Sequence, residues 1–344
     1  MRKSAIALLG IVLAGVVVAA GFDTTQARQE IDLSVWLHER AAGHERWSGL
    51  SKACAASASC RHAPLSVGMP AVWDQPETPP MAVIPPGEFT LGSPSDEAGR
   101  FDDEGPRLQV SIGYGFAVSQ YPVTRGEYAF FVQDAGYAST TECHGYDGET
   151  ELRKKPRFTW RSPGFPQSLD DPVVCIAWND AKAYVDWLSR RTGRTYRLLS
   201  EAEWEYSARA GDSGPWRPEE RAGETCGGNG ADLTAKTRFT DWEVANCRDG
   251  AIFTSPVGRY EANAFGLSDM LGNVWEWVED CRNERYDAAG PRDGRALLTG
   301  DCGRRMMRGG SWHSHPRHLR PAARRADGAG IGYAAYGIRV ARVL

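Results

Sequence analysis

The sequence has few lysines and, beyond its first twenty residues, no long hydrophobic run. Six of its 40 basic residues are lysines, and acidic residues number 44, which gives a formal net charge of −4. The chain therefore lacks the positive excess with which nucleic-acid-binding proteins neutralise phosphates. No segment after residue 20 is long and apolar enough to span a bilayer, and no internal repeat is present.

Tryptophan, glycine and arginine are abundant instead. The 344 residues include 12 Trp and 38 Gly, and arginine makes up the rest of the basic residues. Large aromatic side chains and arginine forks can hold irregular backbone in place. The length favours one large domain with an appendage.

The N-terminal segment has the pattern of a secretory signal peptide. Arg2 and Lys3 precede an apolar run over residues 5–20, which ends in a small-x-small motif before Gly21. An uncleaved membrane anchor is the alternative, but the run is shorter than the roughly 20 residues that a helical span needs. We therefore expect residues 1–20 to be removed, leaving a periplasmic or secreted protein that is not embedded in a membrane.

Export changes what the eight cysteines indicate. An even number of cysteines in an oxidising compartment favours disulfides, and eight cysteines allow about 105 pairings. Short loops close at the lowest entropic cost, which favours sequence neighbours as partners. No pair has the Cys-x2-Cys spacing of a zinc knuckle. The predicted disulfides are Cys54–Cys60, Cys143–Cys175, Cys226–Cys247 and Cys281–Cys302.

Composition divides the rest of the chain into two parts. Residues 21–80 are polar, helical in character at first and rich in proline towards the end, and they predict a linker. Residues 81–344 show no comparable change in amino-acid composition, which predicts one domain.

Local signals predict three helices and several short strands in that domain. The expected helix caps are Thr124 with Gly136, then Asn179 or Asp180, and then Ser200 with Gly211. The expected strands cover residues 81–84, 88–91, 109–112, 196–199 and 337–343. Residues 212–336 contain many turn residues and show little periodicity. The predicted fold class is therefore α+β with much irregular coil.

Several segments resemble the formylglycine-generating enzyme, or sulfatase-modifying factor, family. The most specific are Gly272-Asn-Val-Trp-Glu-Trp277 and Arg308-Gly-Gly-Ser-Trp312. The others cover residues 84–93, 122–128, 172–181, 196–206, 263–271 and 337–340. The resemblance extends over residues 81–344. It implies the sulfatase-modifying-factor fold, which is C-type-lectin-like and has few regular elements.

The chain departs from the family at the copper site. In formylglycine-generating enzymes, two cysteines shortly after the RGGS segment bind the copper with which a sulfatase cysteine is oxidised. Here Ser314 and Leu319 stand at those positions. Soft copper(I) selects thiolates, so serine is a poor ligand and leucine is none. Residues 21–80 are also too short for the iron-binding helical domain of ergothioneine sulfoxide synthases.

What remains resembles an exported branch of the family, which includes the periplasmic pyoverdine-maturation oxidase. That branch has a signal peptide and lacks the copper cysteine pair. Its members oxidise or remodel a secreted small molecule or peptide. The resemblance therefore implies a substrate of that class for this chain.

The resemblance also implies structural calcium. Calcium is a hard cation that accepts carboxylate and backbone carbonyl oxygens. By position, the implied ligands are Asp269, Gly272, Val274 and Glu276. A second site maps less well onto Asn246, Cys247, Asp249 and Ala251, where the loop is shortened. The alternative for the first site is that Asp269 caps a turn and Glu276 pairs with an arginine.

The family's active-site pocket maps onto Trp275 and Ser311. Three histidines, His313, His315 and His318, lie in the stretch that replaces the copper cysteines. Imidazole suits copper and iron, so this cluster is a candidate site for either metal. The alternative is three solvated histidines. Four arginines of the same loop would make an anion-friendly wall: Arg317, Arg320, Arg324 and Arg325.

Three functions are compatible with these features. We favour an exported oxidoreductase that acts on a secreted small molecule or peptide. The second is a non-catalytic module that presents the 278–336 loops to a ligand or protein partner. The third is sulfatase cysteine oxidation, against which Ser314 and Leu319 count. A co-purified transition metal would distinguish the first two.

Overall fold

The computed structural model describes residues 24–344 except 57–71, 141–142, 147–151, 156–157 and 215–225. The chain divides into two compact units, residues 1–61 and 62–344. The first contains the helix α2 (Thr24–Ala56), where a helical character was expected. None of the described helices has the length and hydropathy to cross a membrane. The predicted signal peptide and Cys60, one partner of the predicted Cys54–Cys60 disulfide, lie outside the described residues.

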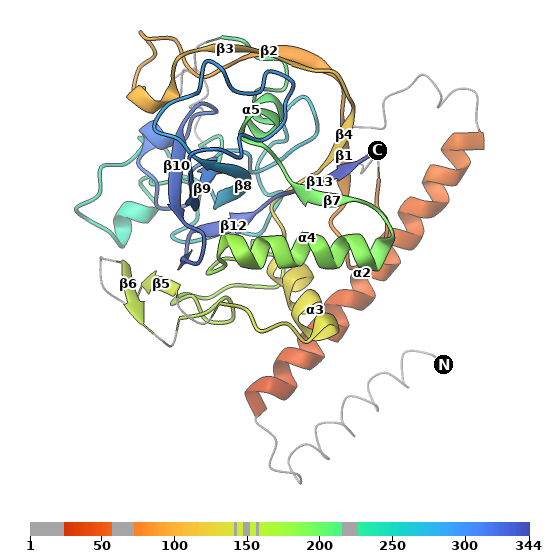
Figure 1. Cartoon of the computed structure of the whole chain (residues 1–344). Helices are drawn as coiled ribbons and strands as arrows, with labels where there is room; N and C mark the ends of the chain where they lie inside the picture. Colours follow the sequence, from red (N-terminus) through yellow and green to blue (C-terminus); the bar gives the residue numbers. More distant parts are fainter. Residues whose placement is uncertain (1–23, 57–71, 141–142, 147–151, 156–157, 215–225) are drawn as a thin grey trace, which may run out of the picture. The chain divides into compact units, whose positions relative to one another are not determined.

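The second unit contains the remaining helices and all the strands that the structure describes (Figure 1). Its helices are α3 (Arg125–Ala135), α4 (Trp178–Thr192) and α5 (Glu201–Arg209), with 3-10 turns at Asp102–Glu104, Ala235–Thr237 and Pro316–His318. Its strands are β1 (Met81–Ile84), β2 (Gly87–Leu91), β3 (Leu108–Ile112), β4 (Phe116–Ser119), β5 (Cys143–Tyr146), β6 (Leu152–Lys155), β7 (Tyr196–Leu198), β8 (Trp275–Arg282), β9 (Asp301–Arg308), β10 (Arg324–Gly328), β11 (Gly332–Tyr333), β12 (Tyr336–Ile338) and β13 (Val340–Val343).

Two four-stranded sheets form the framework of this unit. In the first, β1, β4, β13 and β7 pair antiparallel in that order. In the second, the order is β10, β9, β8 and β12, and only β12 runs parallel to its neighbour. The single strand predicted over 337–343 is therefore wrong. Arg339 separates β12 from β13, so this segment passes from one sheet to the other.

The other predicted strands are confirmed to within one residue at each end. The domain itself has contacts with residues that were expected to be linker. Val72 and Met81 exchange backbone hydrogen bonds of 3.2 and 2.7 Å. The Tyr196 hydroxyl donates to the Asp74 carboxylate at 2.7 Å. Residues 72–80 are thus packed against the expected domain of 81–344.

Capping explains where α3 and α5 begin. The Thr124 hydroxyl accepts from the Glu127 amide at 3.1 Å, and the Glu127 carboxylate accepts from the Thr124 amide at 2.8 Å. Gly136 ends α3 at a left-handed φ of 59°, as predicted. Ser200 caps α5 in the same reciprocal way, but the C-cap of that helix is Ala210 and not Gly211.

The cap expected for α4 is wrong by two residues or more. Ala177 is the N-cap, and the helix begins at Trp178. Asp180 lies inside the first turn, where its carboxylate accepts from the Ala177 amide at 2.8 Å. The carboxylate at the third helical position thus satisfies the backbone amide of the N-cap, which is one half of a capping box.

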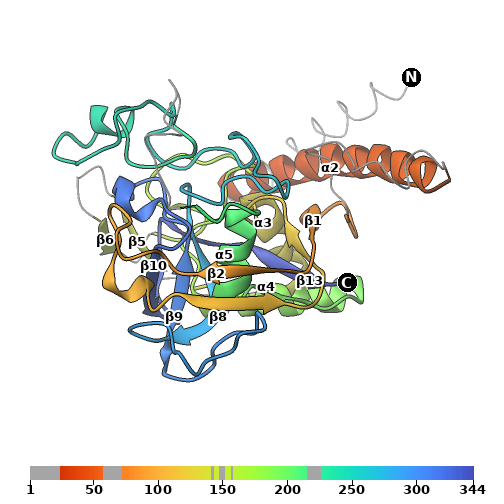
Figure 2. The same cartoon turned by 90° about the horizontal axis from the view of Figure 1, so that it is seen from above.

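The second sheet has two chemically different faces, because successive side chains of a strand point to opposite sides. One face contains Trp275, Trp277 and Met307, which pack in an aromatic core with α3 and α4. The other face contains Glu276 and Arg308, which lie opposite each other in the ladder. The helix α5 contacts β2, β8 and β9 (Figure 2). Buried charges therefore gather on the α5 side, and aromatic rings gather on the other.

Candidate functional site

The two most specific segments of the sequence lie against each other. The Gly272 amide donates to the Gly309 carbonyl at 2.8 Å, and the Trp312 amide donates to the Asn273 carbonyl at 3.0 Å. Gly272 has a φ of 88°, and a Cβ there would lie 2.1 Å from the Asn229 carbonyl oxygen. Only glycine fits this close approach. The contacts place the start of β8 beside the loop that follows β9.

A hydrogen-bonded group of three side chains begins that loop. The Ser311 hydroxyl lies 2.7 Å from Nδ1 of His313 and 3.0 Å from the Ser314 hydroxyl. The Ser314 hydroxyl also accepts from the Ser311 amide at 2.9 Å. Both serines are buried, and His313 is half-buried. Burial and then the positive charge of Arg325 lower the pKa of His313 to about 3. Its ring is therefore neutral at pH 7 and a weak base.

His318 lies against two aromatic rings of the site. Its ring stacks on Phe101 at 4.7 Å between centroids and meets Trp275 edge-on at 6.0 Å. Its Nδ1 atom is buried and has no hydrogen-bond partner. Burial and then Arg325 lower the pKa of His318 to about 4. This imidazole, like that of His313, is neutral at pH 7.

His315 serves a local role. Its Nδ1 accepts from the Arg317 amide at 3.1 Å, and its Nε2 lies 3.2 Å from the exposed carboxylate of Glu243. The ligand atoms of His313, His315 and His318 do not form a group within 4.8 Å of one another, whereas one such group exists elsewhere among the described residues. The structure therefore does not bring the three imidazoles together as a metal cluster.

The predicted arginine wall is divided between the core and the surface. Arg320 and Arg324 are buried, and glutamates pair with both. Arg317 and Arg325 are exposed, and Arg317 packs over Phe101 at 3.7 Å from the ring centre. Two of the four arginines are thus available to an anion from solvent.

The residues of the first implied calcium site lie in the core between the two sheets. Asp269 has a left-handed φ of 56°, and its Oδ2 accepts from the Gly258 amide at 2.6 Å. Its Oδ1 is buried without a partner, and burial raises the pKa of Asp269 to about 6. Glu276 differs, because Arg339 and Trp204 donate to its carboxylate. The orphaned Asp269 oxygen fits a hard cation, whereas the Glu276 charge is already balanced.

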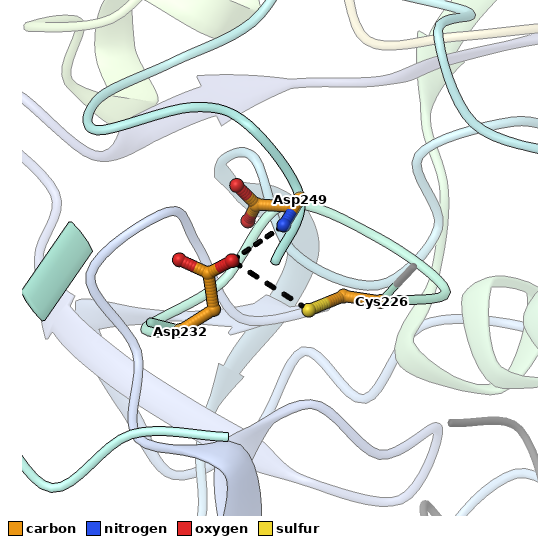
Figure 3. Close-up of side chains that lie close together, drawn as sticks. All are labelled: Cys226, Asp232 and Asp249. Carbon is orange, nitrogen blue, oxygen red and sulfur yellow. Dashed lines mark hydrogen bonds between the residues drawn. The ribbon is translucent and has the colours of Figure 1, made fainter. Parts of the chain in front are cut away.

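The second implied calcium site contains a residue that the sequence reasoning missed (Figure 3). The Asp249 amide donates to Oδ2 of Asp232 at 2.5 Å, so the two buried carboxylates lie close together. Burial, with the negative charge of Asp232 adding to it, raises the pKa of Asp249 to about 7. Asn246 is exposed. The only sequence feature that could have pointed to Asp232 is the glycine-rich turn before it.

Backbone amides partly saturate this acidic pair. Gly230 and Ala251 donate to the Asp249 carboxylate at 3.1 and 2.7 Å. The sulfur of Cys226 lies 3.7 Å from Asp232 but belongs to the disulfide with Cys247, so it offers no thiolate. The oxygen atoms of two aspartates suit calcium better than they suit copper.

Comparison with known proteins decides the family. The model of the sulfatase-modifying factor enzyme 1-like domain matches residues 69–344. The chain belongs to the sulfatase-modifying factor family. The formylglycine-generating enzyme of Mycobacterium tuberculosis is 35% identical over 234 residues, which are 57% of this chain and 72% of that protein. The inactive C-alpha-formylglycine-generating enzyme 2 of Bos taurus is 32% identical over 265 residues, 69% of this chain and 77% of that protein.

A solved structure agrees with this assignment. PvdO from Pseudomonas aeruginosa superimposes with a TM-score of 0.69 at 36% identity, covering 82% of this chain and all of that one. The predicted family and its coil-rich α+β fold are therefore confirmed. Sulfatase-modifying factor relatives include proteins named as enzymes and proteins named as inactive. Membership of the family alone does not fix an activity.

Proposed function

We propose that this chain is an exported oxidoreductase of the sulfatase-modifying factor family that acts on a secreted small molecule or peptide. The observation that carries the proposal is the site around Ser311. It keeps the family pocket residues Trp275 and Ser311 but replaces the first copper cysteine with Ser314, which is bonded to Ser311. The disulfides at 143–175, 226–247 and 281–302 leave no thiol among these six cysteines.

The chemistry available to these side chains is proton transfer. Oxidation of the substrate would release two electrons and two protons, which dioxygen would take up as hydrogen peroxide. The neutral ring of His313 orients the Ser311 hydroxyl, which can relay one of these protons, while the low pKa of the ring makes it a poor final acceptor. Copper or iron stays a prediction, and because the three imidazoles do not converge we assign no step to it.

Dioxygen uptake and peroxide release would test the proposal. The mature protein would be incubated with the secreted small-molecule and peptide fraction of its host, with and without copper or iron. We expect uptake that His313→Phe lowers at least about tenfold, because the Ser311 hydroxyl then loses the ring that orients it. His315→Phe is the matched control, since His315 bonds outside the Ser311 group. Equal uptake by both variants would contradict the role of His313.

A non-catalytic binding module is the second candidate. Similarity to the Bos taurus relative, which is named as an inactive enzyme, favours this candidate. Metal analysis of the purified protein separates the two candidates: a co-purified transition metal supports the oxidoreductase. A metal-free protein that binds a host ligand tightly and consumes no dioxygen supports the module.

Sulfatase activation is the third candidate, and we expect it to be absent. A peptide with the sequence Cys-x-Pro-x-Arg should keep its cysteine even with added copper, because Ser314 and Leu319 are not thiolates. Mass spectrometry would detect the change of that cysteine to formylglycine. A formylglycine-generating enzyme run in parallel is the positive control.

Export is part of the same proposal. The basic start and the apolar run over residues 5–20 support cleavage before Gly21. N-terminal sequencing of the protein from the periplasm or the medium should begin at Gly21. A protein that stays in the membrane fraction with Arg2 and Lys3 intact would support the uncleaved anchor.

We also propose that calcium stabilises the fold at Asp269 and at the Asp232–Asp249 pair. The orphaned Oδ1 of Asp269 and the proximity of two buried carboxylates support this. A cation there would offset the cost of burying negative charge. Thermal unfolding with and without a calcium chelator tests it.

A further inference from the structure

Neighbouring arginines of β10 have opposite surroundings. Arg324 points to the α5 side of the second sheet, where its guanidinium donates to both oxygens of Glu201 at 2.8 Å. Arg325 lies opposite Met307 in the ladder and therefore on the aromatic side. Because β10 is an edge strand, Arg325 reaches solvent at the border of that aromatic face.

The Arg325 guanidinium is held at one end and open at the other. Its Nε donates to the Tyr336 hydroxyl at 2.9 Å, and that hydroxyl donates to the Asp327 carboxylate at 2.9 Å. No hydrogen bond or ion pair joins its terminal nitrogens to any residue that the structure describes. Arg320 and Arg324, in the same loop, each pair with a glutamate. Arg325 thus presents an oriented guanidinium whose two terminal nitrogens contact no carboxylate of the described residues.

The fork lies close to Trp275, one of the two residues that the family resemblance assigns to the pocket. Its central carbon is 6.0 Å from the centre of the Trp275 ring and 5.5 Å from that of Tyr336. His318 meets the same Trp275 ring at 6.0 Å. After burial, the charge of Arg325 is the largest influence that lowers the pKa of His313 and of His318. The histidines, the tryptophan and the open fork therefore surround one region.

We propose that Arg325 binds a carboxylate of the substrate and so selects acidic small molecules or peptides for this site. The inference rests on the proposed function for the location of the pocket, but not on the oxidation itself. A guanidinium fixed through Nε offers its terminal N–H groups to a planar carboxylate in a paired geometry. One open arginine balances one negative charge. Arg317 lies over Phe101, a different ring, so a phosphate dianion is served less well.

Binding of succinate and of its neutral isostere succinamide would test the proposal. NMR would follow the Arg325 Nε–H and Trp275 indole N–H signals, which are assigned by their absence in Arg325→Gln and Trp275→Phe. At constant ionic strength, succinate should shift both signals to saturation, and succinamide should shift neither. Arg325→Gln should raise the dissociation constant for succinate, read at Trp275, at least about tenfold, because a charge-assisted pair is lost. The dissociation constant of Arg325→Lys for succinate should lie between those of the wild type and Arg325→Gln.

Arg304→Gln is the matched control, because Arg304 is an exposed arginine on the adjacent strand β9 that donates to a backbone carbonyl. An equal loss in Arg304→Gln, or equal shifts with succinamide, would overturn the proposal. Tighter binding of inorganic phosphate than of succinate would overturn the assignment to carboxylates. None of these readouts needs turnover. If succinate binds but the host fraction causes no dioxygen uptake, the proposed oxidoreductase activity is contradicted and the carboxylate site is still supported.

Discussion

Arg339 donates from Nε to both carboxylate oxygens of Glu276, at 2.9 and 3.0 Å, and both side chains are buried. The rest of the guanidinium donates to the carbonyls of Ser119 and Ser268, each at 2.7 Å. Glu276 belongs to β8 of the second sheet, and Ser119 belongs to β4 of the first. The ion pair thus joins the two sheets at the residue where the chain passes between them.

Removing one partner of this pair should be costly. Arg339→Leu leaves the Glu276 carboxylate buried without its counter-ion, and we expect the free energy of unfolding to fall by about 3–5 kcal/mol. Urea denaturation would measure it. The double variant Arg339→Leu/Glu276→Leu should recover part of the loss. Arg295→Leu breaks an exposed pair with Asp293 and should change stability by less than about 1 kcal/mol. Equal losses in both single variants would contradict this account.

The Cys281–Cys302 disulfide should stabilise the β8–β9 hairpin region. It links residues 21 apart and is one of the three predicted disulfides that the structure confirms. Replacing both cysteines with serine should lower the free energy of unfolding by about 2–4 kcal/mol, because the unfolded chain regains freedom. Thiol titration of the wild-type protein under denaturing, non-reducing conditions should find no free thiol. Several titratable thiols would contradict the disulfide prediction.

Calcium chelation should lower the melting temperature. A ligand at a hundredfold excess over its dissociation constant stabilises the fold by about 2.7 kcal/mol. Asp269→Asn should weaken the response, because Oδ1 is the unpartnered oxygen of that site. Glu276→Gln is a poor test, since it also disturbs Arg339. His315→Phe is the control and should respond like the wild type. An unchanged melting curve for a demetallated sample titrated with calcium would exclude the ion.

Asp280 should make stability depend on pH. It is buried and accepts from the amides of Glu201 and Leu297, each at 2.8 Å. Burial and then the charge of Glu201 raise the pKa of Asp280 to about 7. The folded protein therefore holds a proton that the unfolded chain releases near pH 4. The contribution of this group is complete below about pH 4 and is lost as the pH rises towards 7, by at most about 1.4 kcal/mol per pH unit.

Asp280→Asn should reduce the fall in the free energy of unfolding between pH 5 and pH 7. Urea denaturation at pH 5, 6 and 7 would compare it with the wild type and with Asp186→Asn, which changes an exposed carboxylate of α4. The slope, and not the absolute stability, is the readout, because the amide also replaces one hydrogen-bond acceptor. A slope in Asp280→Asn equal to that of the wild type would show that another group is responsible.

The sequence was most informative where structure is local. The caps at Thr124 and Ser200 were predictable because each is a short-range exchange of hydrogen bonds within one helical turn. The strands β8 and β9 were not, although they form the centre of the second sheet. Most residues of β8 are buried on both faces, so it lacks the alternation that signals a strand. The exposed, charged start of β9 resembles a loop.

The site was predictable only in part for the same reason. The resemblance mapped Trp275 and Ser311, and the family is confirmed. The pairing of Glu276 with Arg339, 63 residues away, follows from the way two sheets meet. Asp232 was missed because its proximity to Asp249 depends on a loop fold and not on spacing. The open fork of Arg325 was likewise indistinguishable in sequence from its paired neighbours.

The passage of the chain from β12 to β13 has a consequence for the order of assembly. β13 lies between β4 and β7 in the first sheet, and β12 pairs with β8 in the second. Both follow every other described strand in the chain. Neither sheet can be completed until this segment has been synthesised, so the growing polypeptide has no finished core to close early. Under the proposed export, the precursor would therefore stay unfolded for longer before it passes through a secretion channel.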